Sequence, residues 1–412
     1  MSGVAGKRVL LLVPPVTYRA TDFVLAARRL ALDVIIGSDG ALPLGGNPVV
    51  SVDPTDLDAS VRRLHSTVGG LDAVVAVDSD MLPLAARLGE ALGLAGNRPA
   101  AIAAAADKVT QRRHWHHAGI AQPRCRVVPA DADESHLHSA ARSLGFPCIA
   151  KPVSLSASRG VLRVDDDAAL TEAVATIRAI LAETGDCADD GPILLEEYVP
   201  GWELSIDGLL TDGALAVTAI FDKPDMPDGP TFEETLLVTP SRLPATTLAA
   251  ATSLAERAAG ALGLRHGPIH AELRIDTRAG DARPVMLELA ARSIGGLCSR
   301  SLRFLDGTSL EMLILLNALG ARVDLAPAPG AAGVLMLPVE REGELLAVEG
   351  QAEARAVPGI TGLSITLPLG QTVRPLPWGD RYLGFLFAEG RNAIEVEEIL
   401  QLGRRKLRVM IV

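Results

Sequence analysis

The stretch PVMLELAARSIGG at residues 284–296, with GPIHAEL at residues 267–273 ahead of it, contains the residues on which the fold assignment rests. Both segments are short and apolar and predict two neighbouring strands. Each strand carries one carboxylate, Glu272 or Glu288, and Arg292 follows the second strand. Acids on adjacent strands can share divalent cations, and a nearby arginine can hold an anion. The pattern therefore favours chemistry on a nucleotide that is bound with a metal ion.

Composition limits the class of protein. A chain of 412 residues is too long for one simple core, so roughly two or three domains are expected. Hydrophobic residues make up 48% and charged residues 22%, which is typical of a globular protein in water. The formal net charge is −11 and no basic run stands out. We therefore expect no nucleic-acid partner.

The sequence contains no recognisable targeting or membrane segment. Its start, GKRVLLLVPP, has the length of a short strand rather than of the apolar region of a signal peptide. No apolar run reaches the ~20 residues that a bilayer requires, so we expect a cytoplasmic protein with no membrane partner. The cysteines Cys125, Cys148, Cys187 and Cys298 lack metal-binding spacing and are expected to be reduced thiols.

Strand and helix patterns alternate over residues 1–96 and predict a parallel, Rossmann-like α/β domain. The expected strands are residues 8–13, 33–36 and 73–77, and the expected helices are residues 20–32, Leu57–Thr67 and Leu82–Leu92.

The middle of the chain, residues 97–325, has an α+β pattern with strands on either side of a nucleotide-sized gap. A polar loop at residues 184–191 divides it into a first subdomain, 97–190, and a second, 191–325. Helices are expected at residues 100–118, Glu134–Leu144, Asp167–Thr184, 244–262 and 302–320, and strands at residues 124–128, 148–151, 161–164, 193–198, 203–210 and Ala214–Asp222.

The last part of the chain, residues 326–412, predicts a β-rich domain. It opens with APAPGAAG at residues 326–333, which is typical of a linker. Strands are expected at residues 363–367, 382–388 and 407–412, with a helix near residues 393–402. The predicted fold class is therefore a multidomain α/β and α+β protein.

Two lysines stand apart because arginine dominates the basic residues. Lys108 is expected in a helix, and Lys151 ends an apolar strand, FPCIAKP, where its charge must be solvated or paired. Phosphate would suit either lysine, although each alone also fits a surface lysine whose stem is packed. The loop SLSASRG at residues 154–160 follows, and such a loop can turn backbone N–H groups and hydroxyls toward phosphates. It is not a Walker A loop, because GxxxxGK[ST] is absent.

Acidic residues gather in LLEEYVPGWE at residues 194–203. Glu196 and Glu197 end a buried strand, and Glu203 opens the next strand after a Pro-Gly turn. Buried acids without partners are costly, and an adenine amino group or ribose hydroxyls would satisfy them. A solvated hairpin end is the alternative. Lys223, in FDKP, belongs either to a loop that reaches a phosphate or to an ordinary surface loop.

Three histidines, His114, His116 and His117, lie in one expected helix. At helical spacing their side chains point to different faces, and no matching acid or cysteine is near. We therefore interpret them as ordinary helix residues rather than as a metal site.

In this order and spacing, the residues resemble the ATP-grasp superfamily of carboxylate–amine ligases. The resemblance covers about residues 97–320. The start, PPVTYRATDFVLAARRL, and the tail, GFLFAEGRNAIEVEEIL, are similar to the branch of L-amino acid ligases that make dipeptides. The resemblance implies a central ATP-grasp fold of two α+β subdomains and formation of an amide bond with release of ADP and phosphate.

The resemblance also implies roles for single residues. Glu272 and Glu288 match ligands of Mg²⁺, with Mn²⁺ as an alternative ion and Glu288 as the bridge between two ions. Arg292 matches the arginine that stabilises an acyl-phosphate and a tetrahedral intermediate, and His270 would help to form the substrate pocket. The residues that match contacts to ATP are Lys108, Lys151, Ser156, Ser158, Gly160 and Lys223 for the phosphates and the nucleotide, Glu196, Glu197 and Val199 for adenine, and Glu203 for the ribose.

One departure from the family pattern lies beside the second acid. The family usually has Glu-x-Asn there, and its Asn also holds a metal, whereas this chain has Glu288-Leu289-Ala290. Either a water replaces the missing oxygen or one metal site is weakened.

Three functions remain in competition at this stage. A carboxylate–amine ligase with small-molecule carboxylate and amine substrates is favoured, because Glu272, Glu288 and Arg292 all remain. A carboxylase or purine-pathway enzyme that activates bicarbonate or formate is the second function, and a catalytically weak nucleotide-binding protein is the third. Ligases of this type are often dimers, so the resemblance allows a homodimer, but the sequence alone does not give the oligomeric state.

Overall fold

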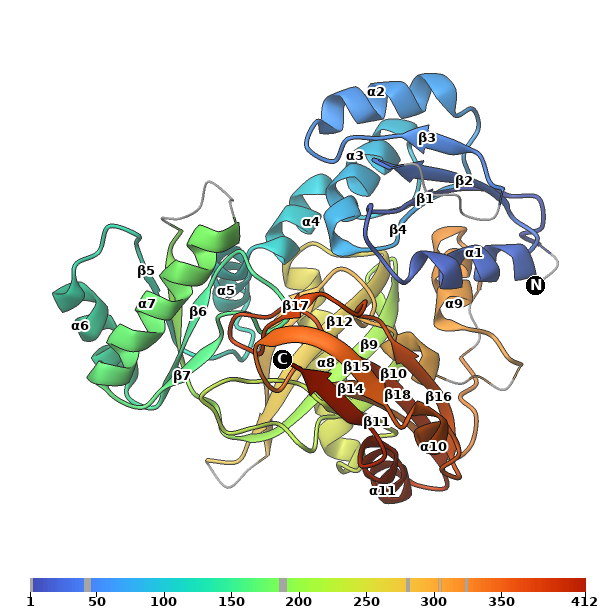
Figure 1. Ribbon diagram of the computed structural model, residues 1–412. Coiled ribbons are helices and arrows are strands. Elements are labelled where there is room, and N and C mark those ends of the chain that lie inside the picture. The colour runs from blue at the N-terminus through green and yellow to red at the C-terminus, as the bar shows by residue number, and fades with distance from the viewer. Residues whose placement is uncertain are drawn as a thin grey trace.

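The computed structural model describes residues 3–40, 46–184, 191–278, 282–302, 304, 306–322 and 325–412. Cys187 and most of the predicted polar loop lie outside these residues. Figure 1 shows three blocks: a blue N-terminal block, a green block beside it, and a yellow-to-red block that contains the largest sheet.

The N-terminal block is the predicted parallel α/β domain. Its sheet has the order β3-β2-β1-β4, and every pair of neighbouring strands is parallel. Leu10 and Leu12 pack toward α2 and α3, whereas Val9 and Leu11 pack toward α1, so β1 is buried on both faces. The elements are β1 (Arg8–Leu12), α1 (Ala20–Arg29), β2 (Asp33–Ser38), β3 (Val49–Ser51), α2 (Leu57–Thr67), β4 (Ala73–Ala76), η1 (Ser79–Met81) and α3 (Leu82–Leu92).

The green block contains a four-stranded antiparallel sheet in the order β5-β8-β6-β7. Two helices, α6 and α7, cover one face of this sheet, and the buried core between them is aliphatic. The elements are β5 (Cys125–Val128), α6 (Glu134–Leu144), β6 (Cys148–Pro152), β7 (Leu162–Val164), α7 (Asp167–Thr184) and β8 (Ile193–Glu197).

The single helix expected at residues 100–118 is wrong, because the chain forms two helices, α4 (Pro99–Ala106) and α5 (Lys108–His117). Asp107 lies between them with extended backbone angles, and its side chain accepts a hydrogen bond from the N–H of Thr110 at 2.6 Å. This is an N-cap, which satisfies a donor that the start of a helix leaves free. As a result Lys108 stands at the first turn of α5.

The largest sheet is antiparallel throughout and has the order β13-β12-β9-β10-β11-β14-β18-β16. The linker expected at residues 326–333 is wrong for residues 331–333, which are buried and begin β14. The strands β14, β18 and β16 therefore continue the central sheet. The domain boundaries stay predictions. The strands are β9 (Gly201–Thr211), β10 (Ala214–Asp222), β11 (Leu236–Thr239), β12 (Gly267–Asp276), β13 (Arg283–Ala290), β14 (Ala331–Leu337), β16 (Ile360–Ile365) and β18 (Gly384–Gly390).

Helices and a small second sheet complete this block. The helix α8 (Ala245–Ala261) covers β12 and β9, and α11 (Ala393–Arg404) covers β14 and β18. The small sheet has the order β17-β15-β19. Its strands are β15 (Gly343–Glu349), β17 (Thr372–Val373) and β19 (Arg408–Ile411), with α10 (Gln351–Arg355) after β15.

The helix expected at residues 302–320 is shorter than predicted. Among the described residues of this range, only α9 (Leu310–Ala318) is helical, and the short η2 (Cys298–Ser301) precedes it. Ser309 caps α9 by accepting a hydrogen bond from the N–H of Met312. Gly307, with φ at +72°, lies in the turn that separates the two elements.

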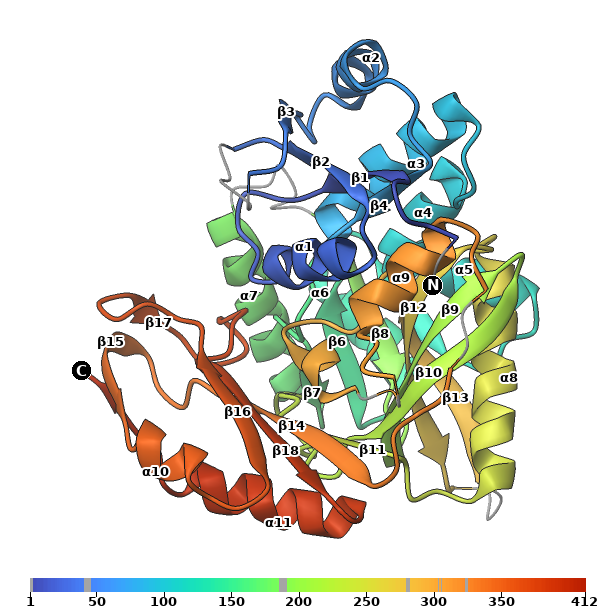
Figure 2. The same ribbon diagram turned by 90° about the vertical axis from the view of Figure 1, so that its right-hand side faces the viewer.

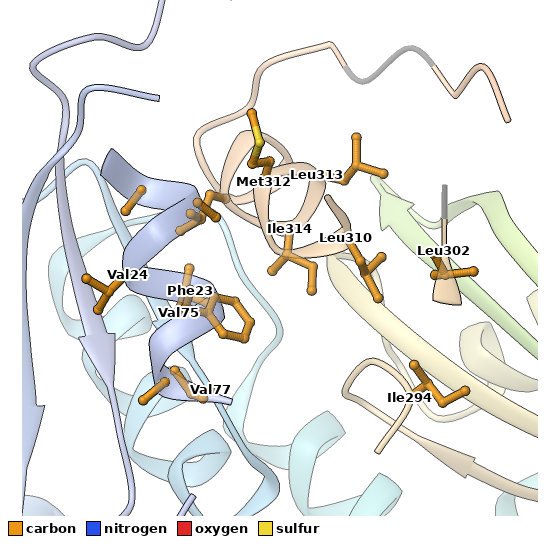
Figure 3. Close-up of a cluster of buried hydrophobic side chains, with 14 of the residues drawn as sticks. Phe23, Val24, Val75, Val77, Ile294, Leu302, Leu310, Met312, Leu313 and Ile314 are labelled. Carbon is orange, nitrogen blue, oxygen red and sulfur yellow. The ribbon is translucent and has the colours of Figure 1, made fainter. Parts of the chain in front are cut away.

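One buried cluster joins the N-terminal block to the central sheet (Figure 3). Helices α1 and α9 lie side by side in Figure 2, and their apolar faces meet in this cluster. Its members include Phe23 and Val24 of α1, Val75 of β4, and Leu313 and Ile314 of α9. The position of the N-terminal block is therefore fixed by a core that it shares with the sheet. Within the described part of the chain, no helix is long and apolar enough to cross a bilayer.

Candidate active site

The two predicted acids face each other across one strand pair. In the antiparallel pairing of β12 with β13, Glu272 lies directly opposite Glu288, and a register shift follows Glu272. Directly opposite residues in such a pair bring their side chains close together. The two side chains are 26% and 37% exposed, so their carboxylates remain accessible to a ligand.

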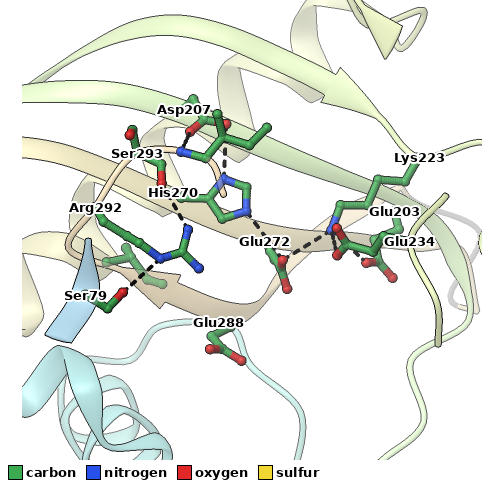
Figure 4. Close-up of polar contacts among 12 residues, drawn as sticks. Ser79, Glu203, Asp207, Lys223, Glu234, His270, Glu272, Glu288, Arg292 and Ser293 are labelled. Carbon is green, nitrogen blue, oxygen red and sulfur yellow. Dashed lines mark hydrogen bonds and ion pairs between the residues drawn. The ribbon is translucent and has the colours of Figure 1, made fainter. Parts of the chain in front are cut away.

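Lys223 lies among three carboxylates at one end of the site (Figure 4). Its Nζ is 3.2 Å from Oε1 of Glu203 and 3.3 Å from Oε1 of Glu272, and it also pairs with Glu234. Burial alone would lower the pKa of Lys223, but the carboxylates raise it well above its usual value. Lys223 is therefore a charged ammonium group that fixes these acids.

The oxygens of Glu203, Glu234 and Glu272 lie within 4.8 Å of one another, and the ammonium group of Lys223 pairs with all three carboxylates. No other set of metal-ligating residues with this spacing occurs in the described ranges. Burial raises the pKa of Glu234, whereas that of Glu272 is lowered well below its usual value because Lys223 and His270 outweigh burial. Glu234 was not among the residues predicted from the sequence, although it lies only eleven positions after Lys223.

His270 connects Glu272 to a buried aspartate. Its Nδ1 is 3.1 Å from Oδ2 of Asp207 on β9, and its Nε2 is 3.4 Å from Oε1 of Glu272. Burial would lower the pKa of His270, but Asp207 and Glu272 together raise it to about 9. The other carboxylate oxygen of Asp207 accepts a hydrogen bond from the N–H of Ile294 at 2.8 Å. Asp207 was not predicted, and the only signal for it is a single acid within the apolar run LSIDGLL.

Arg292 lies where the N-terminal block meets the central sheet. Its Nε donates to Oγ of Ser79 at 3.0 Å, and its Nη1 donates to the carbonyl of Ser293 at 3.0 Å. The buried Arg19 donates to Oγ of Ser293 at 2.5 Å and pairs with Asp78 at 3.3 Å. Arg292 is therefore held where the N-terminal block contacts the central sheet (Figure 4). No local sequence pattern predicts this contact.

Both predicted lysines of the first subdomain are buried, so the surface-lysine alternative is wrong for each. Nζ of Lys108 is 3.5 Å from Oε1 of Glu288 and donates to the carbonyl of Leu155 at 2.7 Å. Nζ of Lys151 is 2.7 Å from Oε2 of Glu196. Burial lowers the pKa of Lys151, although Glu196 opposes that effect.

Glu196 is held by two cations. Besides Lys151 it accepts a hydrogen bond from Nε of Arg112 at 2.5 Å. Burial would raise its pKa, but Arg112 and Lys151 outweigh burial and lower it to about 2. Arg112 also donates to the carbonyl of Leu287 on β13 and so ties α5 to the strand of Glu288.

Two further predicted nucleotide contacts, Glu203 and Val199, lie around another buried arginine, Arg274. Its Nε donates to Oε2 of Glu203 at 2.7 Å, and its Nη1 donates to the carbonyl of Val199 at 2.8 Å. Glu197 instead pairs with Arg124 at 2.6 Å near the surface. Arg112 and Arg274 were not predicted, because an arginine in a histidine-rich helix or in an apolar strand gives no indication of its partner.

The loop with Ser156, Ser158 and Gly160 lies against the C-terminal part of the chain. Ser158 and Gly160 have φ values of +56° and +71°, which turn the loop sharply. The N–H of Gly160 donates to the carbonyl of Pro377 at 3.1 Å. The loop is therefore covered by a segment that lies more than two hundred residues later in the sequence.

Comparisons with known proteins support the fold described above. Residues 144–301 match the ATP-grasp domain, and residues 335–412 match the L-amino acid ligase C-terminal domain 2. The D-alanine–D-alanine ligase of Gloeobacter violaceus is 30% identical over 270 residues, which are 64% of this chain and 83% of that protein. Carnosine synthase 1 of Gallus gallus is 32% identical over 298 residues, which are 68% of this chain.

The match spans about a third of some relatives: 31% of the carnosine synthase and 34% of a D-alanine–D-alanine ligase of Xanthomonas axonopodis pv. citri. The solved structure of an L-amino acid ligase from Bacillus licheniformis covers 99% of both chains, with a TM-score of 0.82 at 24% identity.

The fold, the paired acids and these matches define the class: the chain belongs to the ATP-grasp family of ligases. Within that family it has the fold of the L-amino acid ligases over its whole length, and its last residues match their C-terminal domain.

Proposed function

We propose that the protein is an ATP-dependent carboxylate–amine ligase with an amino acid as one substrate. It forms an amide or peptide bond through an acyl-phosphate and releases ADP and phosphate. The observation that carries this proposal is the position of Glu272 and Glu288, which lie opposite each other between buried lysines and Arg292.

The nucleotide would lie between the first subdomain and the central sheet. Lys108 and Lys151 supply buried positive charge, which the phosphates of ATP need during transfer. The loop with Ser156, Ser158 and Gly160 would cover the phosphates. Residues 196–199 would meet adenine, and Glu203 the ribose.

Glu272 and Glu288 would hold Mg²⁺, with Mn²⁺ as the alternative. Their accessible carboxylates are hard oxygen donors and suit such an ion, while Ala290 adds no oxygen. When bound, the ion would neutralise charge on the transferred phosphoryl group. Lys223 and the charged His270 fix Glu272 in place, so its carboxylate is positioned in advance.

The reaction then has two steps. A carboxylate oxygen of the acid attacks the γ-phosphorus of ATP, and ADP leaves. An amine next attacks the carbonyl carbon of the acyl-phosphate, phosphate leaves, and the amine loses a proton to solvent. Arg292 would stabilise the negative charge that develops on the carbonyl oxygen. The loop at residues 154–160, called the phosphate loop below, contacts the segment around Pro377. This contact would keep water from the acyl-phosphate.

The direct test uses Mg-ATP, a panel of amino acids and other carboxylates, and hydroxylamine as a trap. We expect ADP release together with a hydroxamate of one defined acid. Glu288→Gln should lower the rate of ADP release at least about a hundredfold. Glu344→Gln, on the peripheral strand β15, is the control. Normal turnover by Glu288→Gln would contradict the metal assignment.

The same assay separates the alternatives. ADP release that depends on bicarbonate and yields no hydroxamate would indicate a carboxylase. ATP binding without ADP release from any acid would indicate a nucleotide-binding protein, for which Ala290 is the specific feature. A cytoplasmic location and a homodimer remain predictions.

A further inference from the structure

A cavity of about 270 Å³ lies between the N-terminal block and the central sheet. It is bounded by β4, α3, α4, the start of β12, the residues after β13 and the end of α9. One water molecule needs roughly 10–15 Å³ of such space, so the cavity can hold an organic group. Its position follows from the fold, because β4 is an edge strand whose outer side faces the central block.

The deep walls of the cavity are apolar. Val75 and Val77 come from the β4 segment, Ala86 from α3, Ile102 from α4 and Ile314 from α9, and all five are buried. A charged group in these walls would lose its hydration without a compensating partner. The lining therefore favours an aliphatic or aromatic group, whose transfer from water is favourable.

Polar residues also line the cavity: Arg292 and Ser293, the exposed Glu90 and Arg98, and Asn97, His266 and Asn317. The amide groups of Asn97 and Asn317 already donate to backbone carbonyls. Arg292 is the residue that meets the reacting carboxyl group in the proposed mechanism. A substrate whose carboxyl group lies between Arg292 and the paired acids thus has the cavity directly beside it.

We propose that the cavity binds the side chain of the acid that the enzyme activates. The acid is then an amino acid with a bulky aliphatic or aromatic side chain. This inference rests on the proposed function and adds the substrate class. Small acids leave the cavity filled with water and lose the gain from apolar burial, so they react with lower kcat/KM.

The test narrows the cavity with Ala86→Leu and measures hydroxamate formation from leucine, phenylalanine, alanine and glycine. Wild type should favour the bulky acids, and Ala86→Leu should lower the ratio of kcat/KM for bulky over small acids about tenfold or more. Ala91→Leu is the matched control, because Ala91 lies on the same helix, is exposed and does not line the cavity. Ala91→Leu should keep the ratio of kcat/KM for bulky over small acids within about twofold of the wild-type ratio.

A second variant covers the case in which Ala86→Leu fails to fold, as judged by its melting curve. Ile314→Ala enlarges the cavity, and the ratio for phenylalanine over leucine should rise several-fold. ADP release with ratios that neither variant changes would overturn this inference alone. No ADP release from any acid in wild type would overturn the proposed function and this inference with it.

Discussion

Glu196 illustrates how single charges are balanced in this site. It is buried, and both its oxygens contact cations, Arg112 and Lys151. Replacing one partner of such a group leaves the other charges buried without compensation. The sequence predicted a nucleotide contact for Glu196, and this stays a prediction. In the structure Glu196 also has two protein partners, and its carboxylate thereby holds Lys151 beside Arg112.

Removing this charge should destabilise the protein. The lowering of the pKa of Glu196 from 4.5 to about 2 corresponds to roughly 3 kcal/mol. Glu196→Gln should therefore reduce the free energy of unfolding by roughly that amount in chemical denaturation. Glu197→Gln is the control, because Glu197 pairs with the largely exposed Arg124 and should cost less than about 1 kcal/mol. Equal losses of unfolding free energy in the two variants would contradict the claim that the buried charge of Glu196 stabilises the fold.

The charge of Glu196 also predicts how the free energy of unfolding depends on pH. The folded-state pKa of Glu196 lies below its unfolded value, so its contribution is complete above about pH 4.5 and is lost as the pH falls toward about 2. The difference in unfolding free energy between wild type and Glu196→Gln should therefore shrink over that window. A difference that stays constant with pH would show that Glu196 acts through packing instead.

Ala290 allows a gain-of-function prediction. It lies two residues after Glu288 at the end of β13, so both side chains point to the same face. Ala290→Asn adds an oxygen beside Glu288 and should lower the Mg²⁺ concentration for half-maximal ADP release several-fold. Ala290→Val, which adds volume without an oxygen, should not lower it. An unchanged requirement in Ala290→Asn would mean that the departure from the family pattern does not limit metal binding.

At the scale of elements, residues 374–382 lie against the phosphate loop. Nη1 of Arg374 is 2.7 Å from Oε2 of Glu183, and Nη2 of Arg159 in the loop approaches the same oxygen at 4.0 Å. Arg374 also lies 4.4 Å from the ring of Trp378. One carboxylate at the end of α7 thus connects the loop to the C-terminal part of the chain.

Breaking this contact should affect ATP binding more than folding. Arg374→Ala removes a partly exposed ion pair of about 1 kcal/mol, so the KM for ATP should rise about fivefold. A larger fraction of the ADP should also form without amide product, because water reaches the acyl-phosphate. Arg391→Ala, which removes a surface pair with Glu395, is the control. If Arg374→Ala changes neither the KM for ATP nor the ratio of ADP to amide, Arg374 does not hold the phosphate loop closed.

Most elements could be predicted from the sequence, because their periodicity is local. Leu57–Thr67, Glu134–Leu144, Asp167–Thr184 and Ala214–Asp222 agree with the observed bounds. The two wrong helices share one cause: Asp107 and Ser309 are N-caps inside alanine-rich or apolar segments, whose helical periodicity hides the start of a new helix. The short strand β3 has too few residues to show a pattern.

At the scale of the whole molecule, the shared core around α1, β4 and α9 joins the N-terminal block to the sheet (Figure 3). Phe23→Ala should reduce the free energy of unfolding by about 3–5 kcal/mol. Leu25→Ala on the same helix should change it by less than about 0.5 kcal/mol, because Leu25 is 50% exposed. Melting curves of the two variants check this, and similar curves would mean that the block does not depend on the shared core.

The site itself was only partly predictable. The acids, the lysines and Arg292 could be selected because each stands in a recognisable local segment, and their roles stay predictions. Asp207, Arg112, Arg274 and Ser79 could not, because their roles arise from contacts between strands and blocks far apart in the sequence. The cavity beside Arg292 also exists only in the assembled molecule.

The central claim is that the whole molecule activates a carboxylate as its acyl-phosphate. The most direct measurement uses the acid substrate labelled with heavy oxygen in its carboxylate, together with Mg-ATP and the amine. Our account predicts that each amide formed transfers one labelled oxygen to the released phosphate, as seen by mass spectrometry. Amide formation with unlabelled phosphate would contradict it.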